Sequence, residues 1–187
     1  MNKLLFGLSA MLSVSLLGCQ STDTATLDET HWRYATDPHG SQAILNGSLV
    51  TTEQVEIAFK RVPRVDKLNN SWVELIYDLP NKQLPEQASI TLTYQSDKDM
   101  IIKLSQKDYG GDGDKTYAHY QTALPAANVW TTQTVTLNDF QRPSWTPASS
   151  TDKGIITEHV SALYFVPKLT DAQGGEAFIK IKNVNIK

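Results

Sequence analysis

The sequence contains one cysteine among 187 residues and no strong excess of charge of either sign. A single cysteine can form neither an intrachain disulfide nor a cysteine-based metal cluster. Seventeen Lys and Arg against 20 Asp and Glu give a formal net charge of −3. This balance argues against a dedicated nucleic-acid-binding protein, because such proteins carry a strongly basic surface. Ten glycines and eight prolines also disfavour long helices.

The sequence also lacks the common short catalytic patterns. No G-x-S-x-G, H-E-x-x-H or P-loop segment occurs. The four histidines, at positions 31, 39, 119 and 159, have no metal-ligand spacing. We therefore expect that the protein is not an enzyme. Twenty acidic residues leave room for a carboxylate pair of glycosidase type, so a small glycan-active enzyme stays open as an alternative.

The longest apolar run lies at the N-terminus. Lys3 is followed by an uncharged run over residues 4–17, which is too short to cross a bilayer permanently but is typical of a signal-peptide core. The run ends in Leu16-Leu17-Gly18-Cys19, which resembles the bacterial lipobox, where the cysteine is lipidated and becomes the new N-terminus. An ordinary secretory peptide or a buried N-terminal helix are the alternatives. Because the single cysteine occupies this position, we predict a lipoprotein signal peptide over 1–18 and lipidation of Cys19.

The residues after Cys19 indicate a cellular location and a tether. In Gram-negative lipoproteins an aspartate directly after the lipidated cysteine favours the inner membrane. This sequence has Gln20 there and so resembles lipoproteins that are sorted to the outer membrane. The sequence leaves open whether the protein faces the periplasm or the cell surface. Residues 19–30 are predicted to be the lipidated cysteine and a polar tether, and residues 31–187 the folded domain.

Residues 31–187 have the pattern of a β-domain. Short apolar or alternating segments are separated by turn signals. Asn46-Gly47, between residues 43–45 and 49–50, predicts a hairpin. Further strands are predicted over 55–59, 72–79, 89–94, 100–104, 117–122, 130–137, 160–166 and 177–186. Eight to ten short strands without helical periodicity predict an all-β sandwich or barrel.

Several segments together resemble one known group of modules. They are His31 to Ser41, Ile90 to Asp97, Lys103 to Tyr120, Trp130 to Trp145 and Ala162 to Val184. In this order they resemble the galactose-binding-like carbohydrate-binding modules, and most closely the family 11 carbohydrate-binding modules that are appended to bacterial glycanases. The resemblance covers most of residues 31–187, although no glycanase is attached here.

The resemblance implies a fold and a function. The expected fold is a β-sandwich jelly roll, and the expected function is non-catalytic binding of a polysaccharide or oligosaccharide on a concave sheet. The family also implies a structural Ca²⁺ with Asp37 near it, although Asn183 stands where relatives often place an aspartate. The sequence also resembles the complex I intermediate-associated proteins, which share the same sandwich. That resemblance implies a protein partner instead of a sugar.

The residue types suggest where a sugar would bind. A sugar ring presents an apolar C–H face and a rim of hydroxyls, so its site needs flat aromatic rings and hydrogen-bonding side chains. The candidate carbohydrate-binding residues are Tyr109, Tyr117, His119, Gln121 and Trp145. On a strand, Tyr117, His119 and Gln121 would share one face. The alternatives are a core position for Tyr117, a merely solvated His119, and a Trp145 that closes the end of the sandwich.

Two groups of carboxylates are less specific. Glu74 and Asp78 alternate along the segment 72–79 and could accept hydrogen bonds from sugar hydroxyls. Residues 108–114 hold three aspartates and three glycines, which suit Ca²⁺ chemically but lack the EF-hand spacing. We favour a solvated turn for that segment. The sequence therefore predicts a lipid-anchored, non-catalytic glycan-binding module, with a protein-interaction or assembly role as the alternative.

Overall fold

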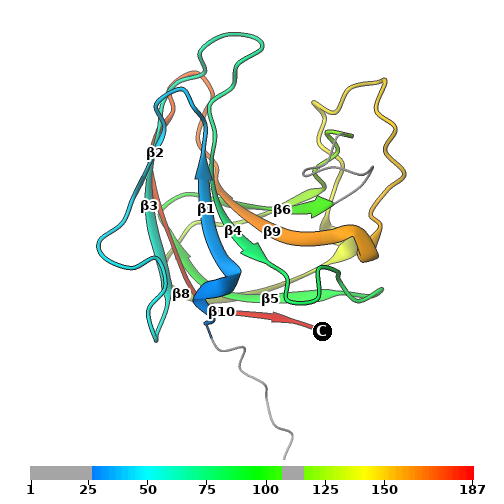
Figure 1. Ribbon diagram of the computed structural model, residues 1–187, viewed down its shortest axis with the longest axis horizontal. Helices are drawn as coiled ribbons and strands as arrows, with labels where there is room; N and C mark the ends of the chain where they lie inside the picture. Colours follow the sequence, from blue (N-terminus) through cyan, green and yellow to red (C-terminus); the bar gives the residue numbers. More distant parts are fainter. Residues whose placement is uncertain (1–26, 107–115) are drawn as a thin grey trace, which may run out of the picture.

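The computed structural model describes residues 27–106 and 116–187, which form two antiparallel five-stranded sheets packed face to face (Figure 1). The first sheet has the order β1 (Trp32–Thr36), β4 (Val73–Asp78), β9 (Val160–Pro167), β6 (Met100–Gln106), β7 (Gln121–Leu124). The second sheet has the order β2 (Gln42–Ile44), β3 (Val55–Arg61), β10 (Gly175–Ile186), β5 (Ser89–Ser96), β8 (Ala127–Thr136). Three short 3-10 turns are the helical elements in the described part of the chain: η1 (Glu29–His31), η2 (Leu137–Asp139) and η3 (Thr157–His159). The predicted all-β sandwich of jelly-roll type is confirmed.

The core lies between the two sheets and follows the period-two alternation of the sequence. Along β5 the side chains of Ile90, Leu92 and Tyr94 are almost fully buried, whereas Thr91 and Thr93 face outward. This is the result expected when one face of a strand is covered by a second sheet. No helix in the described part of the chain is long and apolar enough to cross a membrane.

The predicted hairpin at Asn46-Gly47 is wrong. The strand β2 pairs with β3 instead, and Val50 forms an isolated bridge with Val55. Gly47 has a φ of 112°, but Asn46 is not among the residues with positive φ. A type I′ hairpin turn requires positive φ at both central residues, so this dipeptide serves as a bend between two separate pairings.

One further predicted strand is displaced, and one strand of the structure was not predicted. The strand predicted over 117–122 is displaced to β7, because Tyr117 has a φ of 58° and so interrupts an extended chain. The strand β1 was not predicted, since only Trp32 among its five residues is buried and no alternation marks the segment.

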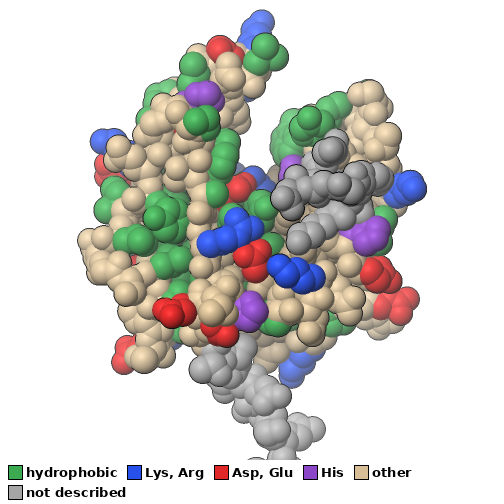
Figure 2. Space-filling model, in the orientation of Figure 1, with side chains coloured by type: hydrophobic (Ala, Val, Ile, Leu, Met, Phe, Trp, Pro, Cys, Tyr) green, Lys and Arg blue, Asp and Glu red, His purple; other side chains and the backbone are tan. Residues whose placement is uncertain are grey.

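Loops at the two ends of strand β9 form two lobes beside the outward face of the first sheet. The Arg61 lobe consists of residues 62–72 and 169–174, and the Trp145 lobe of residues 116–120 and 142–156. In Figure 1 the first sheet curves between the lobes, with β9 and β6 at its floor. The surface is hollowed between the two lobes (Figure 2). The outward face of this sheet is therefore a sheltered but open surface.

Candidate functional site

Five side chains stand in register on the outward side of the first sheet, one from each strand, and one of them, Ile76, is covered by its neighbours and only 2% exposed. Arg33 is paired with Ile76, Ile76 with Tyr164, Tyr164 with Lys103, and Lys103 with Gln121. Paired residues of antiparallel strands lie on the same face. The residues that flank the row along β9 and β6 are buried in the core, so the row itself faces outward. At about 4.8 Å between strands, this cross-strand row extends over about 19 Å.

Two ion pairs hold the polar groups of this face in place. Arg33 donates from Nε and Nη2 to the two carboxylate oxygens of Asp78, at 2.7 and 3.2 Å. Nζ of Lys103 donates to Oε1 of Glu74 at 3.2 Å, and the two side chains are only 19% and 14% exposed. The hydrogen bond to Asp78 raises the pKa of the Arg33 guanidinium, with a further contribution from Tyr164. The face thus presents fixed donors and acceptors whose charges balance.

Tyr164 occupies the centre of the cross-strand row. Its hydroxyl lies 3.2 Å from Oγ of Ser105 on the neighbouring strand β6. It is the single aromatic residue of the row, between Ile76 on one side and Lys103 on the other. A flat ring surrounded by fixed hydrogen-bonding groups offers both an apolar surface and polar partners to a ligand.

The structure brings together some of the sequence-predicted residues but not all of them. The rings of His119 and Trp145 lie 5.8 Å apart between centroids, in the Trp145 lobe. Tyr117 is 57% exposed and Trp145 is 54% exposed, so neither is a core residue. The prediction that Tyr117 shares a strand face with His119 and Gln121 is wrong, because its positive φ breaks the alternation. Gln121 belongs to the cross-strand row, and Tyr109 lies outside the described residues.

A groove of about 500 Å³ continues the outward face past β7. Its lining includes Ile101, Gln121, Ala123, Arg142, Ser144 and Lys168. The guanidinium of Arg142 is 3.2 Å from the Asp152 carboxylate, and Nζ of Lys168 is 3.3 Å from that of Asp99. The groove thus links the cross-strand row to the Trp145 lobe and adds hydrogen-bond donors at its rim.

Sequence reasoning anticipated one part of this site and missed another. Glu74 and Asp78 do line a polar face, as their alternation suggested. Arg33, Lys103 and Tyr164 were not singled out as site residues. For Lys103 and Tyr164 the available signal was their position between core residues on alternating strands, which places a polar or aromatic side chain on the opposite face. No such alternation surrounds Arg33 on β1.

Asp37 has a structural role at the end of β1. Its Oδ1 accepts a hydrogen bond from the amide of His39 at 2.6 Å, and its Oδ2 accepts one from the amide of Trp72 at 2.8 Å. Calcium prefers six to eight oxygen ligands, whereas these neighbours are donors. Among the residues that the structure describes, no group of three His, Cys, Asp or Glu could hold a metal ion. The surroundings of Asp37 therefore do not fit the calcium ion that the resemblance implied.

Acidification should weaken the fold through Asp37. Burial acts to raise the pKa of this carboxyl, but hydrogen bonds from Ser41, Trp72 and His39 outweigh it, so the pKa is lowered. A lowered pKa stabilises the fold above the unfolded value of about 3.9, and the contribution is lost as pH falls through the folded value. We expect Asp37→Asn to cost about 1–3 kcal/mol at neutral pH and to flatten the loss of stability below about pH 4.

Denaturant unfolding at neutral and acidic pH, followed by circular dichroism, measures this effect. Glu53→Gln, at an exposed acidic residue, is the control and should leave the pH dependence unchanged. An Asp37→Asn variant with the stability and acid response of the native chain would contradict the assignment.

Comparison with known proteins supports the fold. No family model and no curated protein sequence matches this chain. A family 11 carbohydrate-binding module from Clostridium thermocellum, in complex with a β-1,3-1,4-mixed-linked tetrasaccharide, has 14% sequence identity and a TM-score of 0.59, covering 84% of this chain and 94% of that one. The family 11 module of a cellulosomal cellulase from the same organism has 15% identity and a TM-score of 0.59, covering 84% and 93%. The chain thus has the β-sandwich fold of these carbohydrate-binding modules.

Proposed function

We propose that this chain is a non-catalytic module that binds a polysaccharide or oligosaccharide across the outward face of the first sheet. The observation that carries the proposal is the cross-strand row, in which Tyr164 lies between side chains fixed by ion pairs. One solved structure of the same fold is in complex with a tetrasaccharide, which supports the same ligand class.

The chemistry of the face suits a neutral chain of sugars. The ring of Tyr164 would stack on the C–H face of a sugar, and the Arg33–Asp78 and Lys103–Glu74 pairs would bind its hydroxyls. Such sites have modest affinity, with a Kd of about millimolar to micromolar, equivalent to about −4 to −8 kcal/mol. Both carboxylates of the face already accept a hydrogen bond from a cationic side chain, which holds them in place as acceptors for the ligand.

Affinity electrophoresis tests the ligand class. Residues 20–187 should be retarded in a native gel that contains one of β-glucan, xylan, mannan, galactan or alginate, relative to a gel without polymer. A chelator in a parallel gel tests the calcium ion that the family resemblance implies, and the geometry at Asp37 favours unchanged migration. No retardation in any of the five polymers would contradict glycan binding for these ligands.

We further propose that the chain is anchored by lipid at Cys19 to the outer membrane. This position lies outside the described residues, and the Leu16-Leu17-Gly18-Cys19 pattern supports the proposal. The first described residues lie at the end of the molecule opposite the two lobes (Figure 1). A tether attached there would leave the candidate face directed away from the membrane. Incorporation of a labelled fatty acid, and its loss in Cys19→Ser, tests the anchor.

A protein-interaction role is the second candidate function. Leu68 is 93% exposed and Val65 is 56% exposed, near the tip of the Arg61 lobe. The turn that presents them is held by hydrogen bonds from the amides of Leu68 and Asn69 to Asp66. A rigid turn with exposed apolar side chains suits a contact with a protein. Leu68→Asp should abolish such a contact and leave retardation by a polysaccharide unchanged.

A further inference from the structure

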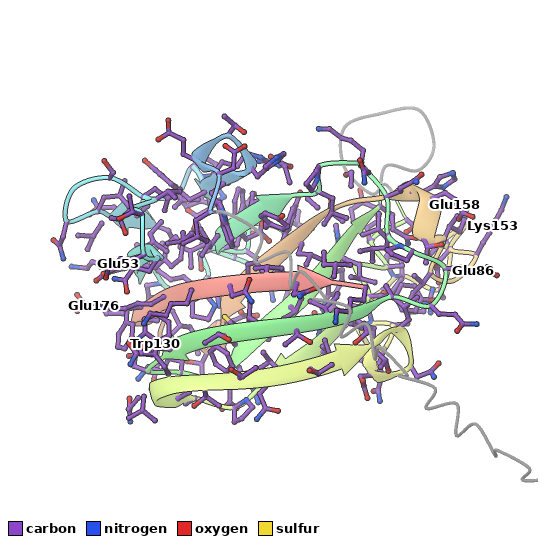
Figure 3. All side chains as sticks on the ribbon, turned by 90° about the horizontal axis from the view of Figure 1, so that it is seen from below. Glu53, Glu86, Trp130, Lys153, Glu158 and Glu176 are labelled. Carbon is purple, nitrogen blue, oxygen red and sulfur yellow. The ribbon has the colours of Figure 1, made fainter. Side chains whose placement is uncertain are left out.

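The four strands at the sheet edges differ in how they are protected. The edge strand β2 has three residues, and β1 has five and carries the charged Arg33. The edge strand β7 has four residues, and at its start Gln121 and Gln141 exchange two backbone hydrogen bonds of 3.0 and 2.9 Å. The fourth edge, β8, has ten residues and borders the second sheet, and none of the described strands lies beyond it (Figure 3). A long open edge is what folded proteins usually avoid.

The composition of β8 makes this edge unusually ready to pair. The strand contains no Lys, Arg, Asp, Glu or Pro, and it is rich in threonine and valine, which favour strands. Within residues 27–106 and 116–187, its backbone–backbone hydrogen bonds lead only to β5. The amide of Thr136 is bound by Asp139, and the Val129 carbonyl accepts from the Thr131 hydroxyl. The open part is therefore its central segment, residues 130–135.

We propose that β8 pairs antiparallel with β8 of a second copy of this chain, so that two five-stranded sheets form one continuous ten-stranded sheet. A two-fold axis through Gln133 would place Thr132 of one copy beside Thr134 of the other. An uncharged strand meets its own copy without like-charge repulsion, which distinguishes this edge from the charged one at β1.

The threonines of the outward face support this register. Thr91 and Thr134 share a hydroxyl hydrogen bond of 2.9 Å across β5 and β8, and Thr93 and Thr132 share another of 2.9 Å. With the axis at Gln133, each of these hydroxyl rows continues into the second copy. Trp130 of one copy would then lie beside Thr136 of the other, on the same face. The pairing therefore adds side-chain contacts to the backbone hydrogen bonds.

Sedimentation velocity over a concentration series tests the pairing. The chain from residue 20, which holds all ten strands, should change from monomer to dimer as its concentration rises. The double variant T132K/T134K places lysines opposite each other across the axis, and its dimer population should fall at least about tenfold. The double variant T91K/T93K adds the same two charges and removes the same two hydroxyl pairs, but its substitutions lie on β5. This matched control should therefore still dimerise. Two β5 strands would be about 14 Å apart in the dimer, beyond the Debye length of about 10 Å at 0.1 M salt.

Two results would overturn the proposal. One is a monomer at every concentration reached. The other is a dimer whose population is equal in the native chain and in T132K/T134K, because the contact would then lie elsewhere. Neither result bears on glycan binding, since the row of Tyr164 and Lys103 lies on the other sheet.

Discussion

Tyr164→Ala is expected to abolish most of the affinity for a retarding polysaccharide, with a loss of at least about 30-fold. This corresponds to about 2 kcal/mol, the cost of removing an aromatic residue at the centre of a binding surface. The ring is the flat apolar element of the cross-strand row, so nothing else in the row can replace its stacking surface. Stability should change little, because the side chain lies on the outward face and not in the core. Isothermal titration calorimetry and a thermal melt measure the two quantities separately.

Two further variants give this prediction its controls. Tyr164→Phe keeps the ring and loses only the hydroxyl near Ser105, so its affinity should fall by severalfold and not 30-fold. Tyr34→Ala removes another exposed tyrosine from the same sheet, but Tyr34 is paired with the buried Leu75 and therefore lies on the opposite face. It should bind as the native chain does. If Tyr164→Ala also binds normally, the ligand lies on another surface, and the rings of Trp145 and Tyr117 become the first candidates.

The sequence could predict the fold class because most strands, although not β1, carry their own pattern of alternating apolar and polar residues. Ile90, Leu92 and Tyr94 alternate with threonines, and this local pattern is enough to identify a half-buried strand. Trp130 shows the value of this alternation over residue type. A tryptophan at the start of a strand favours the core or a corner of the sandwich by type alone, whereas the parity that it shares with Thr132 and Thr134 places it outward. The structure agrees with the parity, because the ring centroid lies 4.6 Å from Nζ of Lys182 on the outward face.

The site could not be predicted in the same way, because it depends on which strands are neighbours. Arg33 and Gln121 stand at opposite ends of the row, and three strands from distant parts of the chain lie between them. No local pattern encodes that order. Gln121 and the carboxylates Glu74 and Asp78 were recognisable from their own strands, whereas the sheet order alone makes Arg33, Tyr164 and Lys103 a group.

Arg61→Ala is expected to cost at least about 3 kcal/mol of stability, because it removes a buried guanidinium that donates several hydrogen bonds and leaves the acceptors at the buried Ser71 without a partner. Its side chain is 9% exposed and donates to the backbone carbonyls of Ser71 and Leu169, both at 3.0 Å. It also donates to Asn70 and forms an ion pair with Asp171. A single guanidinium thus joins both loops of the Arg61 lobe. For a domain of this size, the loss should lower Tm by about 6–12 °C.

The neighbouring residue provides a matched control for this prediction. Lys60 is exposed on the same strand, so Lys60→Ala should change Tm by little. Arg61→Met keeps much of the buried stem but no donors, so it should remain nearly as unstable as Arg61→Ala if hydrogen bonds are the main cause. Full recovery in Arg61→Met would show instead that packing dominates. Gly174, with a φ of 63°, lies so close to the Arg61 carbonyl that no Cβ fits there. The two loops of the lobe therefore approach each other closely at Arg61, and removal of the one side chain that joins them by hydrogen bonds should have a large effect.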